Sequence, residues 1–343
     1  MRSMLVVAVV AALVAVAEAE SPTEPRSGLR ARLADGLMVR LETGGGLAAL
    51  TAGAGDVWAS DYGRERLLRL DGRSGRVLAR LPLGRRIALA AHGRSLWALR
   101  WGGRFWRRPN GPLFRIDPST NRIAARIPLR TSSGRPMVAF GVLACDRSVW
   151  IWGPSRVLRL EPSSGRVLQE FGVGERHGEL TGAVVHRGGL LAATADGHLV
   201  RFDPRRGIRH GRREQALAAA ELLAVAGERV LAAAAGTLVA VDARTGRLLW
   251  RRPLGFRIST VLDHGDVVLA HGAAFRDPGD RVWALEPATG RVLASATVPS
   301  FGTTSMTTAE GSLWFGTGAG EIVVVPRLLT RMFLARARSA VRD

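Results

Sequence analysis

The chain has 343 residues, 47% of them apolar, so a packed core is expected rather than global disorder. Its 49 basic residues are all arginines, and against 29 acidic residues they leave a net charge of +20. The single cysteine, Cys145, excludes an internal disulfide framework and a cysteine-clustered zinc or iron–sulfur site. The charge has two interpretations: a compositional bias spread over a solvated surface, or attraction to an anionic partner such as an acidic glycan, a lipid surface or nucleic acid.

The N-terminal segment has the features of a signal peptide. A continuous apolar run from Met4 to Ala17 follows Arg2, and the triplet Ala17-Glu18-Ala19 has the small-x-small pattern of a cleavage site. A transmembrane helix needs about 20 residues, so the shorter run favours cleavage over an uncleaved anchor. Both interpretations place the rest of the chain outside the cytoplasm, secreted or in the cell envelope. Nucleic acid is therefore the last of the candidate partners.

A strand-and-turn unit recurs through the chain. Its second strand is centred in turn on Trp58, Trp97, Trp150, Leu191, Leu231, Val268 and Trp314. An acidic turn follows at Asp71, Asp117, Glu161, Asp203, Asp242 and Glu286. Alternating apolar residues between these marks predict short, half-buried strands, and the turn glycines supply the positive φ of tight hairpins. Seven such units, most of them about forty residues apart, predict an all-β, seven-bladed β-propeller whose tryptophans and turn acids are structural.

The two ends of the repeat predict how the ring closes. The last unit reaches Pro326 without a fourth strand, whereas a surplus strand, Leu37 to Leu41, precedes the first complete unit. We expect these pieces to form one blade together. The expected domains are a signal peptide at 1–19, a linker at 20–35, the propeller at 36–326 and a basic amphipathic tail at 327–343.

The tail has apolar residues at helical spacing among arginines. Leu328, Leu329, Met332 and Phe333 fall on one side of a helix. Such a helix can lie on an anionic membrane surface, cap the propeller or be loosely ordered, and the sequence does not choose among these placements.

Two stretches resemble known propeller families. Residues 236–250, with Asp242, Thr245-Gly246 and a final Trp250, resemble the pyrroloquinoline-quinone-type repeat, and residues 55–59 are similar to the YVTN-type propellers and the nearby streptogramin-lyase-like group. The resemblance covers nearly the whole mature chain. It implies architecture more than activity, because these propellers include carriers, scaffolds, assembly factors and enzymes.

The resemblance also implies two enzyme alternatives: a quinone-linked oxidoreductase, or a metal-assisted lyase or hydrolase. Quinone dehydrogenases of this class are larger, typically eight-bladed, and often carry a vicinal cysteine pair that this chain lacks. The histidine-and-metal motif of the streptogramin lyases matches no set of residues here. We therefore expect no cofactor, and we favour a non-catalytic module that binds a protein partner or an anionic ligand.

A binding site is expected on the side of the propeller that carries the long loops. The longest insertion follows Trp97 and mixes aromatics, which stack on ligands, with arginines, which pair with carboxylate or phosphate. Its tryptophans could instead form a local hydrophobic plug. The candidate ligand-binding residues on this side are Arg85, Arg86, Arg100, Trp101, Arg104, Phe105, Trp106, Arg107, Arg108, Arg135 and Arg276.

The same side carries three histidines, His177, His198 and His271, with acidic residues nearby in sequence. Imidazole and carboxylate are ligands for transition metals. The histidines do not have the spacing of a site within one element, so the sequence favours isolated histidines over a metal site.

Overall fold

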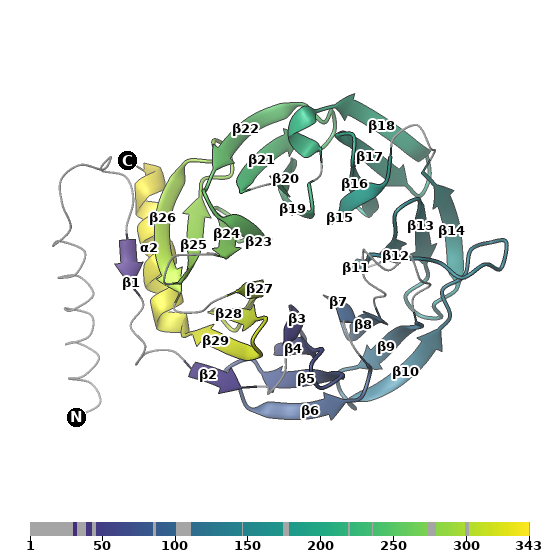
Figure 1. Ribbon diagram of the computed structural model, residues 1–343, viewed down its shortest axis with the longest axis horizontal. Helices are drawn as coiled ribbons and strands as arrows, with labels where there is room; N and C mark the ends of the chain where they lie inside the picture. The colour runs from purple at the N-terminus through teal and green to yellow at the C-terminus, as the bar shows by residue number, and fades with distance from the viewer. Residues whose placement is uncertain are drawn as a thin grey trace.

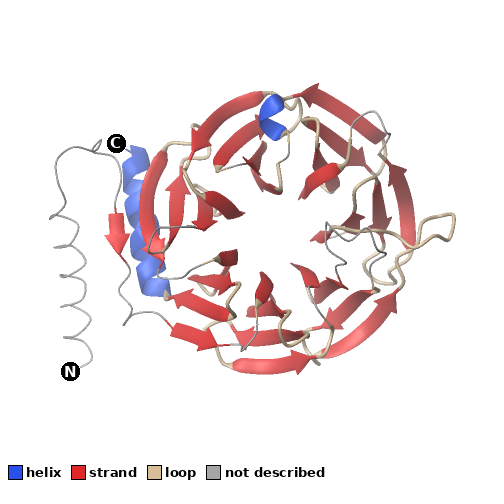
Figure 2. Ribbon diagram, in the orientation of Figure 1, coloured by secondary structure: helices blue, strands red, loops and turns tan. Residues whose placement is uncertain are grey.

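The computed structural model describes residues 30–32, 39–42, 46–84, 87–100, 111–145, 147–173, 178–218, 220–234, 236–273, 279–298 and 302–342. Seven separate sheets stand side by side in a ring (Figure 1). Nearly all the regular structure of the described residues is strand (Figure 2). The prediction of an all-β, seven-bladed propeller is confirmed.

Blades one to five each contain four consecutive antiparallel strands, with the first strand of each blade nearest the centre (Figure 1). Blade one consists of β3 (Leu47–Gly53), β4 (Asp56–Asp61), β5 (Arg66–Asp71) and β6 (Val77–Leu81). Blade two consists of β7 (Ile87–His92), β8 (Ser95–Arg100), β9 (Leu113–Asp117) and β10 (Arg122–Ile127). Blade three consists of β11 (Gly141–Cys145), β12 (Ser148–Trp152), β13 (Arg156–Leu160) and β14 (Val167–Gly172).

The next two blades are separated by a short 3-10 helix, η3 (Gln215–Leu217). Blade four consists of β15 (Leu180–His186), β16 (Gly189–Thr194), β17 (His198–Asp203) and β18 (Gly207–Arg213). Blade five consists of β19 (Leu222–Ala226), β20 (Arg229–Ala234), β21 (Thr237–Asp242) and β22 (Leu248–Pro253).

Segments from the start of the chain join the last two blades. Blade six consists of β23 (Arg257–Asp263), β24 (Val268–Ala273), β25 (Asp280–Leu285) and β26 (Val292–Val298), and β1 (Arg30–Arg32) adds a fifth, parallel strand beside β26. Blade seven consists of β27 (Thr303–Ala309), β28 (Ser312–Thr317) and β29 (Glu321–Val325), with β2 (Val39–Glu42) antiparallel to β29 as its outermost strand.

The connections between strands sort onto two faces. We call the turn face the side with the tight turns that join the first strand to the second and the third to the fourth in each blade, such as residues 186–189 and 203–207. The loop face carries the remaining connections. Turn acids close the turns: Asp71 accepts hydrogen bonds from the Ser74 backbone N–H (2.7 Å) and hydroxyl (2.8 Å), which lower the pKa of Asp71.

The core lies between neighbouring blades. Four tryptophans at the centre of second strands, Trp58, Trp97, Trp150 and Trp314, are almost completely buried. Each packs in a cluster with residues of the following blade; Trp97, for example, lies with Val149 and Leu158 of blade three. This arrangement buries the apolar side of every sheet against a neighbour and needs no other layer to cover it.

The C-terminal helix α2 (Arg327–Arg342) packs against blades six and seven, alongside β26 (Figure 1). Leu329, Leu334 and Ala337 are buried in one cluster with residues of both blades, and Arg291 donates a 2.7 Å hydrogen bond to the Ala340 carbonyl. The apolar side of the tail is therefore used to cap the propeller. Among the described residues, no helix combines the length and the apolar character needed to cross a membrane.

Candidate functional site

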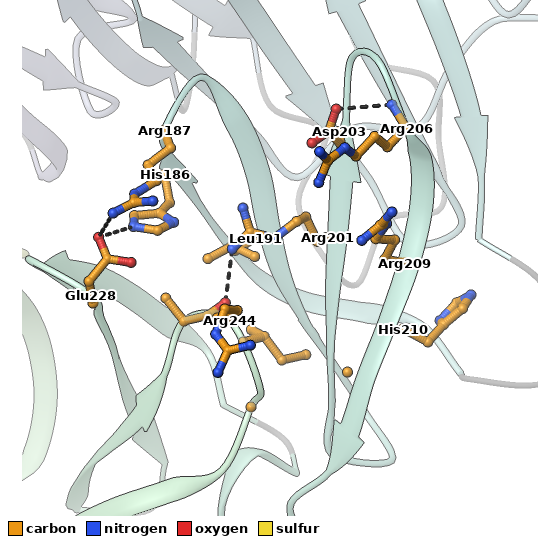
Figure 3. Close-up of a pocket in the computed structure, with 14 residues that line it drawn as sticks. His186, Arg187, Leu191, Arg201, Asp203, Arg206, Arg209, His210, Glu228 and Arg244 are labelled. Atoms are coloured by element: carbon orange, nitrogen blue, oxygen red, sulfur yellow. Dashed lines mark hydrogen bonds and ion pairs between the residues drawn. The ribbon is translucent and has the colours of Figure 1, made fainter.

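A cavity of about 510 Å³ opens on the turn face between blades four and five (Figure 3). Both blades contribute turn residues and blade four contributes its two outer strands. The charged and imidazole side chains in its lining are Arg187, Arg201, Arg206, Arg209, Arg244, His186, His210, Asp203 and Glu228. Leaving the histidines aside, five guanidinium groups against two carboxylates give the cavity a surplus of three positive charges.

Strand register places two of these arginines together. Arg201 on β17 lies directly opposite Arg209 on β18, so both side chains leave the same side of blade four. Arg201 crosses to blade five, where its Nη2 donates a 2.9 Å hydrogen bond to the carbonyl of Ala243. That contact fixes the floor of the cavity, whereas Arg209 is exposed to solvent.

A histidine and an ion pair form one wall. Glu228 Oε1 lies 2.6 Å from Arg187 Nη2 and 3.5 Å from His186 Nε2 (Figure 3). Burial lowers the pKa of His186, and the nearby Arg201 lowers it further against the opposing effect of Glu228. His186 is therefore neutral at pH 7, and Glu228 is balanced by Arg187.

The remaining guanidinium groups make no close ion pair among the described residues, although Asp203 and Asp242 attract Arg206 and Arg244 at longer range. Within the described part of the chain, no acidic oxygen lies within 4 Å of the guanidinium nitrogens of Arg206, Arg209 or Arg244. Asp203 Oδ1 is occupied by the backbone N–H groups of Arg205 (2.8 Å) and Arg206 (3.0 Å); these bonds, together with the charges of Arg206 and Arg201, lower the pKa of Asp203. Three solvent-accessible guanidinium groups, each able to bind a carboxylate or phosphate through two hydrogen bonds, therefore line one cavity.

Most of the candidate residues expected on the loop face lie outside the described residues. This applies to Arg85, Arg86, Trp101, Arg104, Phe105, Trp106, Arg107, Arg108 and Arg276. The two that are described belong to different connections: Arg100 is exposed at the end of β8, and Arg135 is exposed in the loop between β10 and β11. Neither lines the cavity between blades four and five.

Of the three histidines considered as metal ligands, His198 and His271 lie in different blades. His177 lies outside the described residues. His198 Nδ1 is 3.0 Å from Asp196 Oδ2; burial alone would raise the pKa of Asp196, but hydrogen bonds from Thr194 and His198 lower it to about 2. No group of three His, Cys, Asp or Glu residues that could hold a metal ion occurs in the described ranges.

His271 is inside blade six rather than on a loop. It is completely buried on β24, its Nδ1 is 2.7 Å from the Ser259 hydroxyl, and its Nε2 is 3.9 Å from Asp280 Oδ2. Burial lowers the pKa of His271 to about 4 against the opposing effect of Asp280. Asp280 in turn accepts the backbone N–H of Thr303 at 2.9 Å, so this cluster ties blade six to blade seven.

Sequence reasoning missed the cavity, although its residues left a signal. Arginine stands two positions before the turn acid in each of the first four blades, and in blade four alone three more arginines follow closely, at Arg205, Arg206 and Arg209. The register of β17 against β18, which pairs Arg201 with Arg209, is needed to place both on the same side of the sheet.

Comparison with known proteins agrees with the propeller. Residues 84–271 and 153–325 match the family model described as outer membrane protein assembly factor BamB, which confirms the resemblance to the pyrroloquinoline-quinone-type repeats. No curated protein matches the chain in sequence.

Solved structures share the fold at low identity. The structure of U3-55K has a TM-score of 0.68 at 12% identity and covers 85% of this chain and 99% of its own. BamB from Moraxella catarrhalis has a TM-score of 0.53 at 18% identity, with 81% and 82% covered. The computationally designed Ika8 protein has a TM-score of 0.57 at 14% identity, with 82% and 96% covered. At these identities the structural matches establish the architecture alone.

Proposed function

Since the chain belongs to the family described as outer membrane protein assembly factor BamB, we propose that it is an extracytoplasmic, non-catalytic interaction module. In this proposal it holds an acidic segment of a protein partner in the cavity between blades four and five. The family is described as a protein assembly factor, which favours a protein as the partner.

The carrying observation is that the guanidinium groups of Arg206, Arg209 and Arg244 have no acidic oxygen within 4 Å among the described residues. A carboxylate that enters the cavity can form charge-assisted, bidentate hydrogen bonds without first breaking an ion pair. The cavity is open to solvent and about 510 Å³ in volume, so it can take one or two acidic side chains of a longer segment. An acidic peptide therefore matches the cavity in charge and size.

The N-terminal sequence supports the extracytoplasmic part of the proposal. The apolar run and the Ala17-Glu18-Ala19 triplet fit export, and the family is described as an outer membrane protein assembly factor. Alkaline phosphatase fused after residue 343 tests it, because that enzyme needs disulfides that form outside the cytoplasm. An inactive fusion that accumulates in the cytoplasm would overturn the location.

The binding site is tested with a fluorescent glutamate-rich peptide and the chain from residue 20 onward, which keeps every described element. Fluorescence anisotropy measures the affinity of the wild type and of the double variant Arg209→Gln with Arg244→Gln. The control, Arg94→Gln with Arg147→Gln, removes two exposed arginines from equivalent turns of blades two and three.

We expect the cavity variant to bind at least tenfold more weakly, since each lost charge-assisted bond contributes on the order of 1.5 kcal/mol. The control should change affinity less than twofold. Equal losses in the two variants would reduce the interaction to nonspecific charge attraction, and no binding by the wild type would refute the proposal.

A further inference from the structure

The outward side of α2 is strongly basic. The helix contains five arginines and no acidic residue. Its apolar side packs against the propeller: Leu329, Leu334 and Ala337 are buried against blades six and seven. The opposite side of the helix, which carries the exposed residues, therefore faces solvent.

Three arginines form a stripe on that side. Arg327, Arg331 and Arg338 are spaced by four and seven residues, which places them in line along the helix, and all three are exposed. Arg338 is partly neutralised by Asp266 at 2.7 Å. No acidic oxygen among the described residues lies within 4 Å of the guanidinium nitrogens of Arg327 or Arg331.

An apolar side chain stands beside the stripe. Leu328 is 53% exposed, more than any other large hydrophobic residue in the described chain. A leucine flanked by unpaired arginines is suited to the boundary between headgroups and acyl chains, where the arginines bind lipid phosphates and the leucine enters the interface.

The position of α2 in the molecule also brings it close to the segment that follows the N-terminal apolar run in the sequence. β1 pairs with β26, the strand that α2 packs along, so the described chain begins beside this helix (Figure 1). Only residues 18–29 separate the apolar run from β1, a span of at most about 40 Å. While that run is attached and held in a bilayer, the membrane surface lies within reach of α2.

We propose that the outward side of α2 is a docking surface for a membrane rich in anionic phospholipids. Because the apolar side stays packed on the propeller, the helix does not insert, and the contact is a reversible, salt-sensitive attachment through Arg327, Arg331 and Leu328. This surface is distinct from the cavity between blades four and five and does not depend on it.

Sedimentation with vesicles tests the proposal on the chain from residue 20 onward. One vesicle contains phosphatidylglycerol and phosphatidylcholine, and the other contains phosphatidylcholine alone. We expect binding to the first that falls steeply with salt, and at least tenfold weaker binding to the second. The variant Arg327→Gln with Arg331→Gln should bind the anionic vesicles about tenfold more weakly, and Leu328→Ala several-fold more weakly.

Two matched variants separate this surface from other charge effects. Arg94→Gln with Arg147→Gln removes the same charge elsewhere and should retain binding to the anionic vesicles. Arg209→Gln with Arg244→Gln should also retain it, so that failure of the cavity proposal leaves this one standing. Equal binding to both vesicles, or an equal loss in the Arg94/Arg147 variant, would overturn the docking surface; circular dichroism confirms that each variant is folded.

Discussion

Arg201 of blade four donates a 2.9 Å hydrogen bond to the main-chain carbonyl of Ala243 in the turn of blade five. The bond crosses from one sheet to the next and joins elements that share no strand pairing. Equivalent bonds from a blade to the next turn run from Arg69 to Pro118, from Arg115 to Pro162 and from Trp250 to Pro287. Part of the arginine surplus is therefore structural, holding neighbouring blades together.

Replacing Arg201 should weaken the junction between blades four and five. Arg201→Met removes a charge-assisted bond and leaves the Ala243 carbonyl without that donor, so we expect a loss of about 1.5–3 kcal/mol in the free energy of unfolding. Urea denaturation measures it. Arg209→Met, directly opposite on β18, should cost less than about 0.5 kcal/mol, since Arg209 is exposed and forms no ion pair among the described residues. Equal costs would show that Arg201 does not pin the blades.

Gly290 should tolerate no side chain. Its φ is +67°, and a Cβ there would lie 2.5 Å from the Trp250 ring, whose N–H donates to the Pro287 carbonyl at 3.0 Å. Gly290→Ala therefore combines backbone strain with a clash, and we expect it to cost about 3 kcal/mol. Gly207→Ala isolates the strain, because φ is +75° there and a Cβ would have open space. Its cost should be about 1 kcal/mol, measured by the same denaturation.

His271 should make stability depend on pH in a defined window. Its pKa falls from 6.5 to about 4 on folding because it is buried. Between pH 6.5 and 4 the unfolded chain binds a proton at this position and the folded chain does not, so stability falls as the pH falls, and this contribution levels off below pH 4. The difference in melting temperature between wild type and His271→Gln should therefore shift by a few degrees against the wild type across this window. A difference that stays constant from pH 7 to 4 would contradict this account.

Leu334 and Leu328 of α2 should respond differently to truncation. Leu334→Ala leaves a cavity in the cluster shared with blades six and seven, and we expect it to cost about 2–4 kcal/mol of unfolding free energy. Leu328→Ala, on the exposed side of the same helix, should be nearly neutral. If both substitutions were neutral, α2 would not be part of the cooperative fold.

The blade count was predictable from the sequence because seven second-strand centres recur, most of them about forty residues apart, and six of them are followed by an acidic turn. The cavity was not, because it forms between two units and depends on which side of blade four Arg201 and Arg209 point toward. We predicted the site on the loop face because the longest insertion is there. That insertion lies outside the described residues.

His271 shows a related limit. It stands next to an apparent insertion in sequence, yet strand β24 continues through it and carries the imidazole into the core. Its partners, Ser259 and Asp280, come from the strands on either side, so only the pairing of three strands reveals the cluster.

The pairing of β2 with β29 has a consequence for how the molecule is made. Glu42 is synthesised early and meets its partner Glu321 only when almost the entire chain has been translated. Until β29 has been made, β2 has no native partner, and its exposed backbone edge can pair with a non-native strand. Blades one to five contain only consecutive strands and need no segment from the other end of the chain, whereas blade seven cannot be completed before β29 has been made. A chain truncated before β29 would form an incomplete ring with unpaired strand edges at both ends, where aggregation can begin.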